Sequence, residues 1–101
     1  MTNVRVDQLL ELRKALAAKA RCLAERELDA RLLRLNIEAE LVQQGVTKTE
    51  AEKRAKADTR YLTHEAASIR LSYERDLLLA EAEALRFGIL LDLAAVEEVP
   101  S

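Results

Sequence analysis

The chain has 101 residues, of which 50% are apolar, 34% are charged and 3% are aromatic, and its formal net charge is −2. This length suits one domain, and the apolar fraction excludes a disordered chain. The small net charge does not require a nucleic-acid or membrane partner. Two glycines and one proline in a chain rich in Ala, Leu, Glu and Arg predict an all-α protein.

The first predicted helix covers about residues 5–44. Its apolar residues recur every 3.67 residues or so from Leu9 onward, close to the repeat of a straight helix. The period of two expected for a β-strand is absent. We expect its core stripe to be Leu9, Leu12, Leu16, Ala20, Leu23 or Ala24, Leu28, Leu32, Leu35, Ala39 and Val42.

A turn is predicted at residues 45–47. Gly45 fits the left-handed position that ends a helix, and Val46 fits the next position of a Schellman motif. Thr47 and Glu50 have the spacing of a capping box that begins the next helix. The alternative is one continuous helix through Gly45. A link this short would fold the two helices back against each other.

The second predicted helix covers about residues 48–97, with an apolar period of about 3.6. Its expected core stripe is Ala51, Ala55, Asp58 or Thr59, Leu62, Ala66, Ile69, Tyr73, Leu77, Ala80, Ala84, Phe87, Leu91 and Ala94. The expected fold is therefore a single domain over residues 1–101, a long antiparallel αα-hairpin.

More apolar residues lie outside these two stripes than one hairpin can bury. Exposed together they would form a long apolar patch, which monomers rarely tolerate. We expect them to contact a second copy, in a dimeric four-helix bundle or coiled-coil assembly, or another protein. The expected interface residues are Leu10, Leu33, Ile37, Leu41, Leu71, Leu78, Leu85, Ile89, Leu90, Leu91, Leu93 and Val96.

The end of the second helix is its most apolar part. A turn centred on Val46 places Asn3 opposite Ile89, so that residues 89–96 extend past their partner helix. Three arrangements of this segment are possible: it is buried in another subunit or partner, it folds back at Gly88, or it is a frayed helix end.

No arrangement of residues predicts catalysis, a metal site or a cofactor. His64 is the one histidine, and Ser68 occupies the position where an HExxH zinc motif needs its second ligand. We expect His64 to be solvated or capping, and Cys22 to be a small core residue rather than a reactive thiol. The carboxylates are expected to form solvated helix faces, and neither glycine lies in a phosphate-binding loop.

Basic residues gather near the predicted turn. They could contact the phosphates of a nucleic acid, with a tyrosine as a stacking surface, although interspersed carboxylates would weaken the field. The candidate contact residues are Arg31, Arg34, Lys53, Lys56, Arg60 and Tyr61. A solvated face held by salt bridges is the alternative.

Residues 44–61 contain a Gly45-x-Thr47 turn, a segment rich in Glu, Ala and Lys, and an Asp58-x-x-Tyr61 pattern. Together with residues 79–86, this stretch resembles small helical-hairpin proteins of phages and prophages. The resemblance implies an accessory or assembly role and carries no catalytic residue across. The long apolar C-terminal segment departs from that pattern.

The expected function is therefore that of a non-enzymatic, oligomerising protein-interaction module. The alternatives are a nucleic-acid-binding accessory protein and an inhibitor or antidote that caps a partner protein. A signal peptide and a membrane-spanning segment are not recognisable, which favours the cytoplasm.

Overall fold

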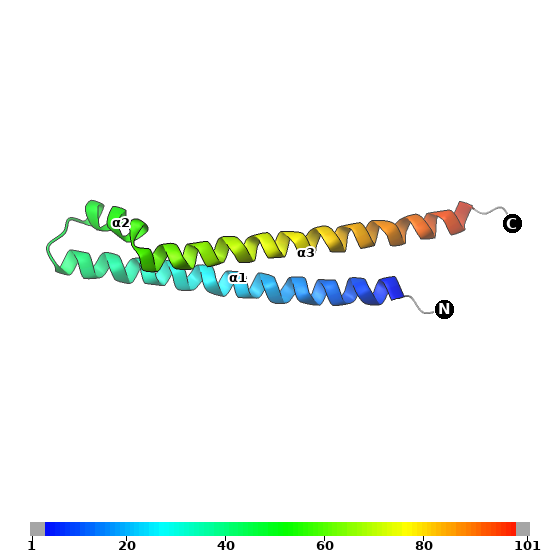
Figure 1. Ribbon diagram of the computed structural model, residues 1–101, viewed down its shortest axis with the longest axis horizontal. Helices are drawn as coiled ribbons and strands as arrows, with labels where there is room; N and C mark the ends of the chain where they lie inside the picture. The colour runs from blue at the N-terminus through cyan, green and yellow to red at the C-terminus, as the bar shows by residue number, and fades with distance from the viewer. Residues whose placement is uncertain (1–3, 99–101) are drawn as a thin grey trace. The chain divides into compact units, whose positions relative to one another are not determined.

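A computed structural model describes residues 4–98 of the chain and contains three helices (Figure 1). They are α1 (Val4–Gln43), α2 (Lys48–Ala57) and α3 (Thr59–Glu98). Outside the helices the described chain consists of residues 44–47 and residue 58, and no strand occurs between residues 4 and 98. The prediction of an all-α protein is confirmed. Across this described part, no helix has both the length and the apolar character needed to cross a membrane.

The end of α1 has both hydrogen bonds of a Schellman motif. The backbone N–H of Val46 donates to the carbonyl oxygen of Leu41 (3.1 Å), and that of Gly45 donates to the carbonyl oxygen of Val42 (3.0 Å). Gly45 has a φ of +92°, a conformation that side chains with a Cβ rarely adopt. The last carbonyl groups of α1 are thereby paired where the helix ends.

The start of α2 is capped by Thr47. Its hydroxyl oxygen accepts a hydrogen bond from the backbone N–H of Glu50 (3.4 Å), which is one half of a capping box. The carboxylate of Glu50 instead pairs with Arg54 one turn later (3.1 Å). The cap therefore depends on the threonine hydroxyl.

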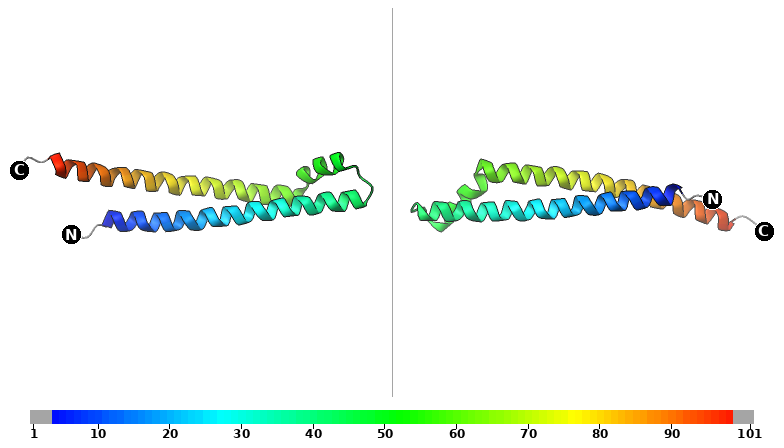
Figure 2. Two further views of the ribbon diagram at one scale, coloured as in Figure 1. Left: turned by 180° about the vertical axis from the view of Figure 1, so that it is seen from behind. Right: turned by 90° about the horizontal axis from the view of Figure 1, so that it is seen from below.

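The expectation of one helix over residues 48–97 is wrong, because the helix is interrupted at Asp58. This residue is extended (φ −67°, ψ 133°) and ends α2, its N–H donating to the carbonyl oxygen of Ala55. It also begins α3, because its carboxylate accepts the backbone N–H of Arg60 (2.8 Å). Both views in Figure 2 show α2 leaving the line of α3 at this point.

The described residues fall into two compact units. The turn unit is Arg21–Ser72, and the end unit comprises the described parts of Met1–Ala20 and Tyr73–Ser101. In the turn unit, Ala51 and Ala55 of α2 are fully buried. In the end unit, α1 and α3 run antiparallel and are linked by the ion pairs Arg5–Asp92 and Lys19–Glu74, the latter at 2.9 Å (Figure 1).

In the end unit α3 continues as a helix through Gly88 to Glu98, so the alternative of a fold-back at Gly88 is wrong. Ile89 is half-buried, and the side chains of residues 90–96 are exposed. Asp92 pairs with Arg5, so α1 and α3 lie side by side at least as far as residue 92. The expected register ended their contact near residue 89.

The helices bury a stripe that repeats every seven residues, which we call the inner seam. Its spacing alternates between three and four residues, as in a coiled coil. On α1 the inner seam is Leu9, Leu12, Leu16, Lys19, Leu23, Arg26, Ala30, Leu33 and Ile37, all buried or half-buried. On α3 it is Tyr61, His64, Ser68, Leu71, Arg75, Leu78, Ala82, Leu85 and Ile89, again all buried or half-buried.

The expected core stripes are therefore wrong at Ala20 and beyond Leu23 on α1, and along α3. The predicted α1 stripe takes consecutive steps of four residues from Leu16 to Leu32, whereas the inner seam alternates steps of three and four. It thereby reaches the opposite face, where the structure leaves Leu28, Leu32, Leu35 and Val42 exposed.

Substituting each glycine with alanine should shift stability in opposite directions. Gly45→Ala forces a Cβ into the left-handed region and should cost about 1–2 kcal/mol. Gly88→Ala relieves a helix-interior glycine, and its new Cβ would lie 3.7 Å from a flexible Arg5 atom, so it should stabilise by about 0.5–1 kcal/mol. Thermal unfolding followed by circular dichroism measures both, and changes of the same sign would contradict the assigned conformations.

Two α1 residues distinguish the inner seam from the opposite face. Ile37 is 2% exposed and Leu35 is 47% exposed. Ile37→Ala should lower the free energy of unfolding by about 2–4 kcal/mol, because it leaves a cavity. Leu35→Ala, the matched control, should cost less than about 1 kcal/mol. Urea unfolding measures the free energy of unfolding of both variants. A larger decrease for Leu35→Ala than for Ile37→Ala would mean that the buried and exposed faces of α1 are assigned the wrong way round.

Candidate interaction surface

The residues expected to contact a partner divide into two groups in the structure. One group lies on the intramolecular side: Ile37 is buried, and Leu33, Leu41, Leu71, Leu78, Leu85 and Ile89 are half-buried. Their assignment to a partner surface is corrected, because neighbouring helices of the same chain already cover them. The other group remains exposed and comprises Leu10, Leu90, Leu91, Leu93 and Val96.

The largest exposed apolar stripe lies along α3 in the end unit, and we call it the outer seam. Its spacing alternates between four and three residues over three heptads. The outer seam is Tyr73, Leu77, Ala80, Ala84, Phe87, Leu91 and Ala94, all exposed. Tyr73 is 65% exposed and Phe87 is 63% exposed, which is unusual for side chains of this size.

This stripe lies on the side of α3 opposite the inner seam. A shift of two residues, or about 200° around the helix, separates the two stripes, so they face in opposite directions. The apolar periodicity of the sequence identifies the residues of the outer seam but predicts them as core. The periodicity does not show which of the two apolar stripes on α3 meets the neighbouring helix.

The flanks of the outer seam are more acidic over its first half than over its second. The flanking positions of the first half are Glu74, Asp76, Glu81 and Glu83, and those of the second half are Gly88, Leu90, Ala95 and Glu97. Glu74 and Asp76 have the ion-pair partners Lys19 and Arg75. A helix that covers the outer seam must therefore avoid further negative charge beside its first half.

A second exposed stripe lies on α1 in the turn unit. It comprises Leu28, Leu32, Leu35, Ala39 and Val42, spaced by four and three residues. A shallow groove of about 470 Å³ runs beside its end and is lined by residues of α1 and α2 that include Leu35, Val42 and Ala51. This stripe is shorter than the outer seam, and its large side chains are all aliphatic.

The basic residues near the turn are largely neutralised by carboxylates. Arg60 pairs with Asp58 (3.2 Å) and Glu40 (3.5 Å), and the hydrogen bond with Asp58 raises the pKa of Arg60. The same hydrogen bond lowers the pKa of the Asp58 carboxyl group below its ordinary value. Lys53 and Lys56 are exposed on α2. These contacts leave less positive field for phosphates than the sequence suggested.

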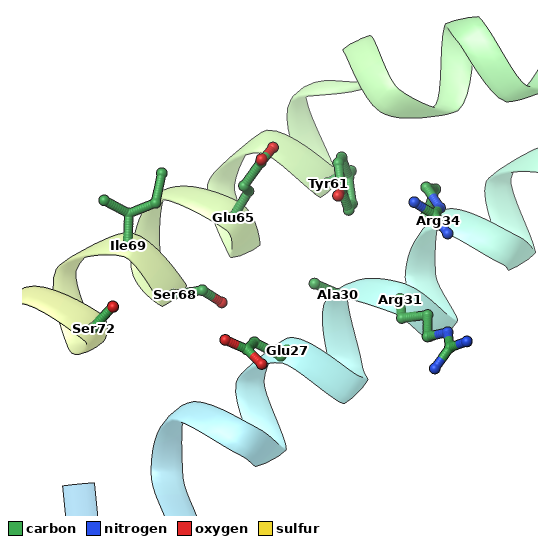
Figure 3. A pocket seen from close by; sticks show the side chains of 9 residues that line it. All are labelled: Glu27, Ala30, Arg31, Arg34, Tyr61, Glu65, Ser68, Ile69 and Ser72. Carbon is green, nitrogen blue, oxygen red and sulfur yellow. The ribbon is translucent and has the colours of Figure 1, made fainter. Parts of the chain in front are cut away.

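Arg34 and Tyr61 lie beside a cavity of about 460 Å³ in the turn unit (Figure 3). The Arg34 guanidinium carbon lies 5.9 Å from the centroid of the Tyr61 ring, within the range of a cation–π contact. Its Nε is 3.7 Å from a carboxylate oxygen of Glu38. Arg31 lines the same cavity, which also has Glu27 and Glu65 in its wall. The cavity is thus mixed in charge, and one face of the tyrosine ring is already occupied.

His64 and Cys22 differ from their expected settings. His64 is half-buried on the inner seam, and its Nδ1 is buried with no hydrogen-bond partner in the described structure. Cys22 is exposed rather than part of the core. Within residues 4–98, no group of three His, Cys, Asp or Glu side chains could hold a metal ion.

Comparisons with known proteins place no further constraint on the surface. No protein-family model, curated protein or solved structure matches the chain.

The acid sensitivity of the α2–α3 junction should depend on Asp58. Because its pKa is lowered in the folded state, the ionised carboxylate stabilises the fold above its ordinary pKa of 3.8, and this contribution is lost as the pH falls through the folded value. Asp58→Asn keeps a side chain that can cap but cannot ionise. Thermal unfolding at pH 7 and pH 2.5 should show that the parent exceeds the variant in melting temperature by more at pH 7 than at pH 2.5. An equal gap at both pH values would contradict the role of the charge.

Proposed function

We propose that this chain is a non-enzymatic protein-interaction module that associates with itself through the exposed apolar stripes of its long helices. The proposed protomer is an antiparallel αα-hairpin, and a pair of such hairpins forms a coiled-coil or four-helix assembly. Its proposed setting is the cytoplasm, in an accessory or assembly role of the kind found among phage proteins.

The observation that carries this proposal is the amount of apolar surface left in water. Large apolar side chains remain exposed along both long helices, for example Leu28 at 53%, Tyr73 at 65% and Phe87 at 63%. Contiguous apolar stripes of this kind are rare on monomers and mark sites of protein association.

Nothing in the described side chains favours the nucleic-acid alternative over this proposal. Arg34 and Arg60, the central cations of the basic face, each lie beside a carboxylate. An inhibitor that caps another protein would use the same apolar stripes, and association with a foreign chain rather than with itself would distinguish it.

The mass of the protein in solution tests self-association directly. Light scattering and sedimentation equilibrium should give at least twice the mass of 11.4 kDa at micromolar concentrations. A uniform monomer at every concentration up to about the millimolar range, corresponding to binding weaker than about −4 kcal/mol, would overturn the proposal.

A charge on the outer seam should weaken the assembly. Leu91→Asp places a carboxylate where Leu91 is 53% exposed, and we expect at least a tenfold rise in the dissociation constant. The matched control is Leu79→Asp on the same helix, where Leu79 is 43% exposed but lies off the outer seam. Sedimentation of parent, variant and control at several concentrations gives the comparison, and equal effects of the two substitutions would contradict a role for the seam.

A further inference from the structure

We infer that the partner of the outer seam is the outer seam of a second copy, paired antiparallel with Leu77, Ala80 and Ala84 against Ala94, Leu91 and Phe87 of the other chain. This inference rests on the proposed self-association and adds its surface, direction and register. It is carried by two features of α3: the heptad spacing and the order of large and small residues.

The heptad spacing specifies a helix as the occupant. Apolar residues that alternate between steps of three and four form knobs that fit the holes of a second helix over a long contact. Between residues 77 and 94 the outer seam extends for about 26 Å along α3. The inner seam lies on the opposite side of α3, so the helix from α1 that covers it does not obstruct the outer seam.

The order of large and small side chains makes the outer seam complementary to itself in an antiparallel arrangement. In the proposed register Leu77 faces Ala94, Leu91 faces Ala80, and Phe87 faces Ala84 of the second copy. Every large side chain between residues 77 and 94 then meets a small one, which lets the two layers interdigitate at the density of a protein core, while Tyr73 lies beyond the paired segment. The contacts are repeated by the two-fold symmetry.

The flanks mostly place acidic residues beside uncharged ones in this register. In an antiparallel coiled coil, residues on one flank face residues on the equivalent flank of the partner. Glu81 then faces Gly88, Glu83 faces Leu90, and Glu74 faces Ala95 of the second copy. Asp76 is the exception, because the same rule sets it opposite position 97, which is a glutamate. The flanks therefore do not select the register, and the order of large and small side chains does.

The competing arrangements pair large side chains with large ones. In the antiparallel register one heptad away, Ala80 would face Ala84 and Leu77 would face Phe87 of the second copy. In a parallel pair in register, each residue of the outer seam would face its own copy, so that Phe87 would meet Phe87. Small residues facing small ones leave gaps and large residues facing large ones crowd, which disfavours both arrangements.

Disulfide trapping tests the direction and the register in the full chain. A background variant, Cys22→Ser, removes the exposed native thiol. In that background a tagged Ala80→Cys chain and an untagged Leu91→Cys chain are mixed and mildly oxidised. We expect the mixed disulfide between the two chains to exceed either homodisulfide at least tenfold, because only this pairing places the two sulfur atoms at one layer.

Charge variants at Leu90 provide a second readout that involves no cysteine. Leu90 faces Glu83 of the second copy in the proposed register and Ala95 in a parallel pair. Leu90→Lys should therefore dimerise roughly tenfold more tightly than Leu90→Glu, because two contacts change from attraction to repulsion. The two variants share the loss of the leucine, so their ratio isolates the charge. We expect raised salt to reduce this ratio.

The outcomes separate this inference from the proposed function. A dominant Ala80→Cys homodisulfide, or equal dimer affinity of the two Leu90 variants, overturns the antiparallel register. A dimeric mass in the parent with neither the mixed disulfide nor a Leu90 effect overturns the outer seam but leaves self-association standing. A monomeric parent overturns both. If these cysteine chains fail to dimerise, the Leu90 ratio decides the direction, and the mixed disulfide of Leu77→Cys with Ala94→Cys decides the register.

Discussion

Within each unit of this protein, a long helix packs along one face only, and this one-sided packing determines which side chains leave water. The buried set is small, and apart from Leu23 and Ile37 it consists of alanines: Ala30, Ala51, Ala55 and Ala82. Small residues at these positions let helix axes approach closely, so that half-buried leucines beside them can pack. Stability then depends on many partial contacts along the inner seam rather than on a central core.

One-sided packing also explains why polar side chains are tolerated on the inner seam. Lys19 and Arg26 lie at positions that a deeper core would reserve for apolar residues. Their aliphatic stems can cover the neighbouring helix while their charges reach solvent, and the Lys19 ammonium reaches Glu74 at 2.9 Å. An apolar stripe that is occasionally interrupted by a long cation can therefore still be the buried one.

Local chemistry made the end of α1 and the start of α2 predictable from sequence. Gly45 and Thr47 act through their own backbone geometry and nearest neighbours, so the residue types alone indicate their positions. Asp58 also caps a helix, but it stands among strong helix formers and lacks the Glu or Gln three residues later that would complete a capping box. Its signal is thus a single residue, and a continuous helix is equally compatible with the local sequence.

The choice of face could not be predicted because both faces of each helix are apolar over long stretches. On α1 the stripe through Ala30 and Ile37 competes with the stripe through Leu28 and Leu35, and between residues 26 and 42 the second carries more leucine. Both stripes advance by steps of three and four residues, so the seven-residue repeat does not separate them. They differ in length, since the inner seam keeps this repeat from Leu9 to Ile37 and the other stripe keeps it only from Leu28 to Val42.

The outer seam is an exposed apolar stripe of α3 whose sequence is more specific than burial alone requires. A smooth apolar stripe would bind other helices in any direction and at any register. Here its bulky residues alternate with alanines, and carboxylates such as Glu81 and Glu83 flank one half of it. Volume limits which registers can close, because each large side chain needs a small one opposite it. In the proposed dimer the apolar stripe supplies the free energy of association, and the order of large and small residues restricts that association to one geometry.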